Sequence, residues 1–470
     1  MGREIEDSHF GPDDFAEFER RLREETDLLR RWLEGGALSD APPMGGFELE
    51  AWLVDRRGHP ASINEAYLAR LDEPLVVPEL ATFNVELNGA PQSLEGDALT
   101  RLYRDLRDLW ARCAIGAEEM GARLAMIGIL PTARPEDFTL SNMSRMQRYA
   151  ALNEQVLRLR KGRPIEIDIQ GVDRLRVTHH DVMLEAAATS FQIHLKVDAA
   201  AAGRYYNASK ILSGPMVALS ANAPFLFGHD LWAETRVPLF EQAVAVAGSD
   251  LTQRVSFGVG YVGDIIECFL VNRDRYPLLL PHLMDERPEA LAHLRLHNGT
   301  IWRWNRPLIG FDGDIPHLRI EHRVVPSGPT VADAIANAAF YFGAVHALAR
   351  RRSPPEWEIP FETARHNFYN GARYGLSARA GWLGGTRLAM DRLCLDELLP
   401  LARDGLADLG IGEGEGRYWL GLVEERVRRG LTGAIWQRRY VERHGLDMEA
   451  LVGAYLERQA SDLPVHQWNL

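Results

Sequence analysis

The sequence predicts an α+β fold with a mostly antiparallel sheet, and three observations lead to this prediction. Short strand-like segments alternate irregularly with long helical segments, unlike the regular repeat of a doubly wound parallel sheet. Four of the strand-like segments alternate apolar and polar residues, as strands with one buried face do. The helical segments carry apolar stripes that can cover that buried face.

Each element is placed by its own pattern. Apolar residues at helical spacing predict helices over residues 13–34 and 97–115. A third helix should begin near Thr330, because Thr330 and Asp333 resemble a capping box just before a long apolar run. Period-2 alternation or β-branched and aromatic composition predicts strands at 46–54, 83–88, 123–129, 190–197, 254–257, 264–271 and 317–325. After SPPEWEIP (353–360), which breaks the periodicity, the chain is mostly helical.

The composition limits the classes of function. The 470 residues are 46% hydrophobic and 25% charged, as in ordinary globular proteins, and the net charge is −13 with basic and acidic residues interleaved. We therefore expect no nucleic-acid partner, because a phosphate-binding surface needs clustered positive charge. The three cysteines are widely spaced without a C-x-x-C motif, which argues against disulfides and zinc and favours a cytoplasmic location. No apolar run approaches the ~18 residues of a membrane span, so no membrane partner is expected.

Four strand-like segments carry an unusual set of polar residues. In GFELEAWLVD (46–55), Glu48 and Glu50 project from one side of the strand and apolar residues from the other. The same alternation groups further polar residues on three other strands: Asn84, Glu86 and Asn88; Gln192, His194 and Lys196; and Arg319, Glu321 and Arg323. A solvated sheet face would explain any one strand alone. Together these faces are rich in carboxylate, imidazole and guanidinium groups, so we expect a concave site with ligands for Mg²⁺ or Mn²⁺ and arginines for phosphate.

This set of groups suits phosphoryl transfer from ATP, because carboxylate-held divalent ions can bridge phosphate oxygens while arginine neutralises developing charge. The chain has no GxxxxGK[ST] motif, so the nucleotide would bind without a P-loop. GVGYVG (258–263) fits the dinucleotide fingerprint, but a strand is expected to follow it, so we interpret it as a turn or bulge between two strands. We interpret His179, His180 and the GEGEG run (412–416) as loop residues.

Several segments form a set with a fixed order and spacing: GFELE (46–50), PELATFNVELNG (78–89), FQIHLKV (191–197), ASKILSGPMVALSANAPFLFG (208–228), TIWRWNRP (300–307), LRIEHRVVPSG (318–328) and NGARYGL (370–376). This set resembles the glutamate-cysteine ligase and carboxylate-amine ligase family of the glutamine synthetase-like superfamily. The resemblance covers roughly residues 45–380. It implies a curved, mostly antiparallel sheet with helices on one face and the active site on the other. The implied organisation is an N-terminal helical extension (1–40), a catalytic domain (41–380) and a helical C-terminal portion (381–470) packed on it.

The resemblance also assigns roles to individual residues. It implies metal ligation by Glu48, Glu50, Glu79, Glu86, His194 and Glu321. Glu79 lies off the strand face that holds Glu86, so its role rests on the resemblance alone. Arg323 matches the arginine that contacts the transferring phosphoryl group, and with Glu86 and Glu321 it forms the expected catalytic set. The residues expected around the nucleotide are Arg306, Arg319, Gln192 and Lys196. The two arginines could instead face a substrate carboxylate.

The implied activity is that of an ATP-dependent ligase that uses Mg²⁺ or Mn²⁺ and forms an amide through an acyl phosphate. The implied small-molecule substrates are glutamate, through its γ-carboxylate, and cysteine or another amine, and the implied assembly is a homodimer. The substrate pair stays open, because Leu195 and Lys196 follow His194 where small or polar residues are expected, and Asn305 stands in place of an acid. A guanidino phosphotransferase of the same superfamily and a non-catalytic metabolite-binding paralogue are the alternatives.

Overall fold

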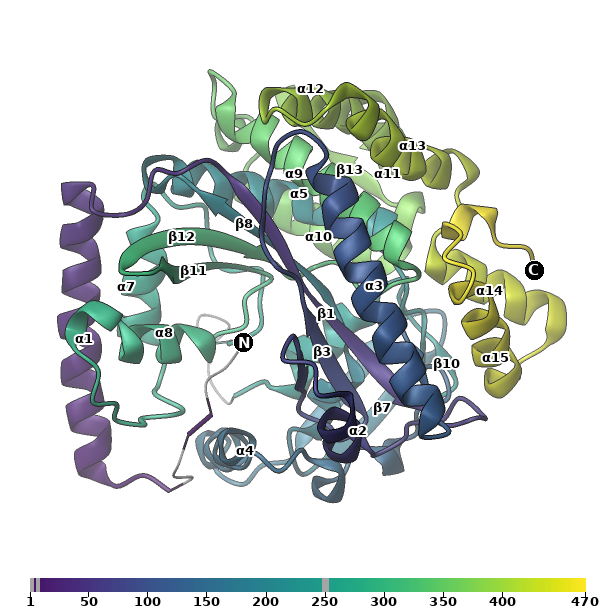
Figure 1. Cartoon of the computed structure of the whole chain (residues 1–470), viewed down its shortest axis with the longest axis horizontal. Helices are drawn as coiled ribbons and strands as arrows, with labels where there is room; N and C mark the ends of the chain where they lie inside the picture. The colour runs from purple at the N-terminus through teal and green to yellow at the C-terminus, as the bar shows by residue number, and fades with distance from the viewer. Residues whose placement is uncertain (1–3, 6–8, 247–252) are drawn as a thin grey trace.

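The centre of the molecule is an eight-stranded antiparallel sheet (Figure 1). A computed structural model describes residues 4–5, 9–246 and 253–470. The main strand order is β11-β12-β8-β1-β3-β2, and β4 and β5 pair with opposite ends of β1. The strands are β1 (Met44–Val54), β2 (Val76–Pro78), β3 (Asn84–Asn88), β4 (Gln92–Ser93), β5 (Arg123–Ala125), β8 (Phe191–Val197), β11 (Asn305–Asp312) and β12 (Ile315–His322). The prediction of a mostly antiparallel sheet is confirmed, although β5 is shorter than the strand expected at 123–129.

The strand register brings the polar residues of four strands onto one face of the sheet. Glu50 on the central strand β1 is the direct cross-strand partner of Glu86 on β3. On the other side of β1, β8 pairs with β12 so that His194 lies opposite Glu321. Glu48 lies two residues from Glu50 and therefore projects from the same face of β1. The polar faces predicted from the alternation thus converge on one surface.

Helices cover the opposite face of the sheet. They are α3 (Ala98–Glu119), α5 (Ala202–Ser220) and α9 (Val331–Arg350), and their apolar residues form one core with the sheet. The central strand contributes its other set of side chains to this core, and Leu49 and Leu53 are completely buried. Burial of a large apolar side chain is worth roughly 1.5–3 kcal/mol. This core therefore holds the strands, and with them the polar surface, in a fixed register.

Helix α9 begins where its N-terminal signal predicts. The side-chain oxygen of Thr330 accepts a hydrogen bond from the backbone N–H of Asp333 at 3.1 Å, as an N-cap does. By length and composition α9 could cross a membrane, but 94% of the relevant stretch is buried inside the protein. A buried core helix meets the same criterion, so this finding does not assign α9 to a membrane.

The N-terminal helix α1 (Pro12–Gly35) lies outside the sheet, as predicted, at the left of Figure 1. It packs on α7 (Ile266–Arg275) and α8 (Ala292–Gly299). The buried carboxylate of Glu25 on α1 lies 2.6 Å from Nδ1 of His293 on α8. The N-terminal helix is therefore attached to the body of the protein by a buried polar contact as well as by its apolar stripe.

The C-terminal part of the chain is helical and packs against the helices behind the sheet. Its main helices are α10 (Phe361–Tyr374), α12 (Leu399–Asp408), α13 (Glu413–Arg429), α14 (Gly433–His444) and α15 (Met448–Gln459). Helix α10 contacts α5, and both α12 and α13 contact α9. Arg426 on α13 forms a fully buried ion pair of 2.7 Å with Asp333 on α9. The apolar stripes predicted in this region thus find partners on the helical layer.

Smaller elements complete the fold. They are α2 (Asn64–Leu71), α4 (Gln147–Leu159), α6 (Arg236–Ala243), α11 (Met390–Arg392), β6 (Ile165–Gln170), β7 (Arg174–His179), β9 (Phe225–Leu226), β10 (His229–Asp230), β13 (Arg379–Gly381) and β14 (Arg387–Ala389). The last six form three two-stranded sheets. Short 3₁₀ turns and one π-helical turn connect these elements.

The strand prediction at 264–271 is wrong, because most of this segment belongs to helix α7. Its β-branched and aromatic residues favour a strand by intrinsic preference. However, Ile265, Cys268 and Phe269 are buried and have the i, i+3, i+4 spacing of one helix face. Packing of that face outweighs the weaker intrinsic preference.

Other predictions change as well. The segment 254–257 forms no strand, so GVGYVG (258–263) lies in a loop that leads into α7 rather than between two strands. A helix does follow these glycines, but without a strand directly before them they do not form a dinucleotide-binding turn. The GEGEG run (412–416) is not a loop, because α13 begins within it and its glutamates occupy the first turn, where negative charge is favourable. His179 is the last residue of β7, while His180 lies outside the strand.

Candidate active site

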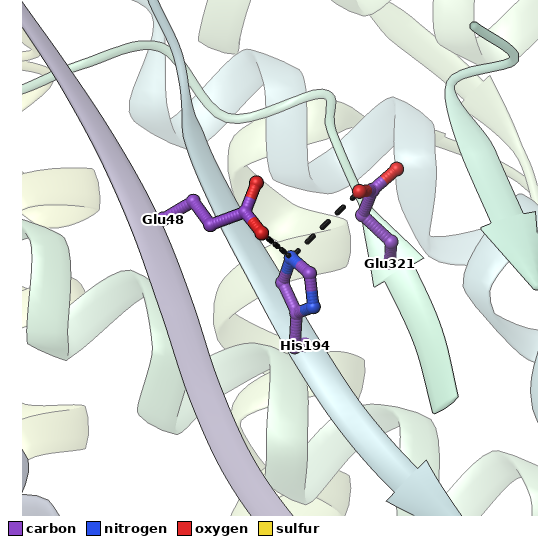
Figure 2. A group of neighbouring side chains, drawn as sticks. All are labelled: Glu48, His194 and Glu321. Atoms are coloured by element: carbon purple, nitrogen blue, oxygen red, sulfur yellow. Dashed lines mark ion pairs between the residues drawn. The ribbon is translucent and has the colours of Figure 1, made fainter. Parts of the chain in front are cut away.

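The first group of converging side chains consists of Glu48 on β1, His194 on β8 and Glu321 on β12, which we call the first triad (Figure 2). Nε2 of His194 lies 3.6 Å from Oε1 of Glu48 and 3.8 Å from Oε1 of Glu321. That nitrogen is buried and has no hydrogen-bond partner among the described residues. Burial lowers the pKa of His194 to about 4, so its imidazole is neutral at pH 7, the form that binds a metal ion.

Arginines balance the charge of the first triad. Arg306, opposite Glu321 on the neighbouring strand, donates from Nε and Nη2 to the two carboxylate oxygens at 2.7 and 2.8 Å. Arg323 donates to the same carboxylate at 3.3 Å. Burial alone would raise the pKa of Glu321, but the guanidinium groups of Arg306 and Arg323 hold that pKa well below its usual range. The protein itself thus keeps this buried carboxylate ionised.

The second triad consists of Glu50 on β1, Glu79 between β2 and β3, and Glu86 on β3. One ligand oxygen from each lies within 4.8 Å of the other two. Burial raises the pKa of Glu50 and of Glu79 to about 7 and that of Glu86 well above its usual range, and repulsion among the acids adds to this effect. Arg323 and Arg148 act in the opposite direction without cancelling it. Three hard oxygen donors in this arrangement fit Mg²⁺ or Mn²⁺.

Hydrogen bonds orient the second triad and connect it to the first. The backbone N–H of Ser190 and the side-chain amide of Gln192 donate to the two oxygens of Glu50 at 2.6 and 2.8 Å. The amide oxygen of Gln192 also accepts a hydrogen bond from Arg323. Asn88 donates to Glu86 at 3.1 Å. Gln192 therefore joins Arg323, which contacts Glu321 of the first triad, to Glu50 of the second triad.

Both triads border a cavity of about 350 Å³ on the polar side of the sheet. Its other walls come from the segment 185–192, from α6 and from the segment 284–304, which includes α8. The guanidinium of Arg319 lines this cavity and makes no hydrogen bond within the described part of the chain, while its Nε atom is buried. An anionic ligand such as phosphate would supply the missing acceptor.

The structure brings most of the predicted site residues together. Those that line the cavity are Glu48, Glu50, Glu79, Glu86, Gln192, Arg306, Arg319 and Arg323. His194 and Glu321 complete the first triad behind them. Lys196 does not line the cavity, because its Nζ pairs with Asp312 at 2.5 Å further along the sheet.

Arg148, Glu185 and Arg236 also line the cavity, and no pattern in the sequence identifies them. The alternation of β3 does place Asn84 on the same face as Glu86, and Asn84 lines the cavity as well. Its side chain is 2% exposed, and both amide atoms lack hydrogen-bond partners within the described residues. Arg148, Glu185 and Arg236 lie on helical turns that no strand alternation predicts.

Comparisons with known proteins agree with this architecture. Residues 44–454 match the model of a family described as glutamate-cysteine ligase family 2. A glutamate–cysteine ligase from Francisella tularensis, solved in complex with AMP, is 12% identical with a TM-score of 0.56, over 92% of this chain and 96% of that chain. A bifunctional glutathione synthetase from Pasteurella multocida is 11% identical with a TM-score of 0.50, over 96% of this chain and 55% of that one. A search of curated proteins found no match. The structural similarities show the fold, α+β with a curled antiparallel sheet of the glutamine synthetase-like type.

Proposed function

The chain belongs to glutamate-cysteine ligase family 2, a family of carboxylate-amine ligases, and from this premise we propose that it joins an amino-acid carboxylate to an amine at the expense of ATP. The γ-carboxylate of glutamate is the first donor to test, and cysteine is the first acceptor. The observation that supports the proposal is the pair of ligand triads in one cavity together with Arg319 and Arg323. A cavity lined by carboxylates, an imidazole and arginines suits a nucleoside triphosphate with divalent cations.

The proposed reaction has two steps. A carboxylate oxygen of the donor attacks the γ-phosphorus of ATP, the bond to the β-phosphate oxygen breaks, and ADP leaves an acyl phosphate behind. The nitrogen of the acceptor then attacks the acyl carbon, the carbon–oxygen bond to phosphate breaks, and phosphate leaves. The acceptor ammonium loses two protons over the sequence to become an amide nitrogen. Enclosure in the cavity limits hydrolysis of the acyl phosphate by water.

The residues of the chain divide these tasks among them. The first triad and the second triad would each hold a divalent metal ion, and such an ion would neutralise negative charge on the phosphates. Arg323 lines the cavity and is hydrogen-bonded to both Gln192 and Glu321, and in this proposal its guanidinium would stabilise the transferring phosphoryl group. Arg319 has unused donors for a terminal or β-phosphate. The AMP bound to the Francisella relative makes ATP the first nucleotide to test.

The test is ADP release from ATP with glutamate and a panel of amines, with Mg²⁺ or Mn²⁺ and with EDTA, combined with mass spectrometry of the products. We expect metal-dependent ADP formation stimulated by at least one amine, with an amide among the products. Glu50→Gln should abolish turnover while the protein stays folded. A phosphorylated guanidino compound without an amide would instead identify a phosphotransferase. Binding of metabolites without any ADP formation would identify a non-catalytic paralogue and overturn the proposal.

A further inference from the structure

Glu185 lies on a wall of the cavity that carries other groups of the site. It belongs to a short 3₁₀ helix, Met183–Ala187, which packs against α6. From Glu185 the chain follows the cavity wall to Ser190 and Gln192, the residues that hydrogen-bond to Glu50. Glu185 is therefore directed into the same cavity as both triads without belonging to either of them.

The carboxylate of Glu185 has no counter-charge of its own. Its Oε2 atom is buried without a hydrogen-bond partner, and the side chain forms no ion pair within the described residues. Arg323 is the cation whose charge reaches it, but that guanidinium is already hydrogen-bonded to Glu321 and Gln192. Burial raises the pKa of Glu185 to about 8, and the negative charge of Glu50 adds to the effect. A partly buried carboxylate of this kind is stabilised when a cation binds beside it.

The surroundings favour an ammonium group over a third metal ion. A divalent cation needs several converging oxygen or nitrogen ligands, and neither triad includes Glu185. The nearby Arg323 guanidinium would also repel a double positive charge more strongly than a single one. A primary ammonium carries one charge and three N–H donors, so a single carboxylate can recognise it. Both the acceptor amine and an amino-acid donor such as glutamate present this group.

We propose that Glu185 is the counter-charge for the ammonium group of a substrate. This inference rests on the proposed ligase function and adds a recognition site to it. Glu185→Gln removes the charge and keeps the size of the side chain, while Glu185→Asp keeps the charge. Loss of a hydrogen bond to a charged group is worth roughly 1.5–3 kcal/mol, which corresponds to about 10-fold to 150-fold in kcat/KM.

Two substrate substitutions separate the possible sources of the ammonium. Hydroxylamine replaces the acceptor with a nucleophile that is largely unprotonated at neutral pH, and glutarate replaces glutamate with a donor that lacks an ammonium group. If Glu185 binds the acceptor, Glu185→Gln lowers kcat/KM for the best amine at least about tenfold and leaves hydroxamate formation within about twofold. If it binds the donor, the KM of glutamate rises at least about tenfold with either acceptor, while turnover of glutarate is unchanged. Either result supports the proposal, and Glu185→Asp should restore part of the loss.

Glu286→Gln is the matched control, because Glu286 lines another wall of the same cavity. We expect this variant to treat the charged and uncharged substrates alike. An equal loss by Glu185→Gln with all substrates, no loss at all, or a higher Mg²⁺ requirement would each overturn the ammonium site. Wild-type protein that forms neither amide nor hydroxamate would overturn the ligase function itself, and the ammonium site with it, so the two failures are distinguishable.

Discussion

The two triads use the same kinds of ligand on the same face of one sheet, but they differ in how their charge is balanced. In the first triad, Arg306 and Arg323 contact Glu321 and keep it ionised, and the imidazole of His194 is neutral. In the second triad, three carboxylates lie close together, Glu86 buried and the other two partly buried, and burial with mutual repulsion raises their pKa values. The protein itself therefore balances the carboxylate charge of Glu321 in the first triad, whereas the charges of the second triad repel one another without such a balance.

The difference follows from the neighbouring strands. The first triad includes residues of β8 and β12, and the next strand in the sheet is β11. Strand β11 supplies Arg306 directly opposite Glu321. On the side of β3, the next strand is the short β2, which supplies no cation and is followed by another acid, Glu79. The apolar core behind β1 holds both arrangements in place. Binding of metal and stability of the fold should therefore be coupled mainly through the second triad.

We expect the largest effect from a substitution that removes the charge balance of the first triad. Glu321→Gln leaves Arg306 and Arg323 with a neutral partner, and removal of one member of a buried charge pair costs about 3–5 kcal/mol. We expect the free energy of unfolding of the metal-free protein, measured with urea, to fall by about that amount. The double variant Glu321→Gln with Arg306→Met should recover at least half of the loss. Unchanged stability of the single variant would contradict the charge balance described for this triad.

The corresponding Glu→Gln substitution in the second triad should raise the stability of the metal-free protein instead of lowering it. Glu86→Gln removes one of three repelling carboxylates, so we expect the metal-free protein to gain about 1 kcal/mol of stability while turnover falls at least about 100-fold. Wild-type protein should gain about 2.7 kcal/mol from Mg²⁺ at 100 times its dissociation constant, and the variant should lose most of that gain. Thermal and urea unfolding in EDTA measure the stability of the metal-free protein, and the same experiments in Mg²⁺ measure the gain from metal binding. A destabilised Glu86→Gln protein in EDTA would show that repulsion among these carboxylates does not lower the stability.

The third prediction concerns the pH dependence of stability, which we expect to come from the second triad. The pKa values of Glu50 and Glu79 are raised to about 7 in the folded protein, above the usual value of an unfolded glutamate. The folded state therefore holds more protons between about pH 4.5 and 7, and the stability of metal-free protein falls as the pH rises through this range. We expect a loss of at least about 1.4 kcal/mol between pH 5 and 8 in EDTA, the equivalent of one pKa unit. The loss of stability should be smaller in the Glu79→Gln variant, and smaller in wild-type protein with Mg²⁺. If the stability of wild-type protein and of Glu79→Gln instead rises with pH to the same extent, the raised pKa values of the second triad are ruled out.

The sequence could predict the part of the site that strand alternation encodes. Five site residues keep the phase of a regular strand, and the register of the sheet then brings them together. They are Glu48, Glu50, Glu86, His194 and Glu321. What alternation cannot encode is the partner of each charge, because the partner depends on which strands become neighbours.

The errors and omissions have the same origin in tertiary structure. The bidentate contact between Arg306 and Glu321 appears only once β11 pairs with β12, and Glu185 enters the cavity on a 3₁₀ turn with no periodicity to detect. The β-branched composition of α7 favours a strand, but the helical spacing of its buried apolar residues makes it a helix. Packing decided each case, and packing is a property of the assembled fold.

The smallest expected effect tests how far the polar face of β8 belongs to the site. Lys196 has the same phase as His194 and Gln192, so alternation alone places it on the polar face that carries the candidate site. Its Nζ is instead paired with Asp312, whose side chain is 55% exposed, and it does not line the cavity. An ion pair with a solvent-exposed partner is worth about 0–1 kcal/mol. Lys196→Met should therefore change stability by less than about 1 kcal/mol and the KM of ATP by less than about threefold, as measured by urea unfolding and ADP release. A much larger increase in the KM of ATP would mean that Lys196 leaves Asp312 for the nucleotide, and that the site extends one strand position further than the cavity indicates.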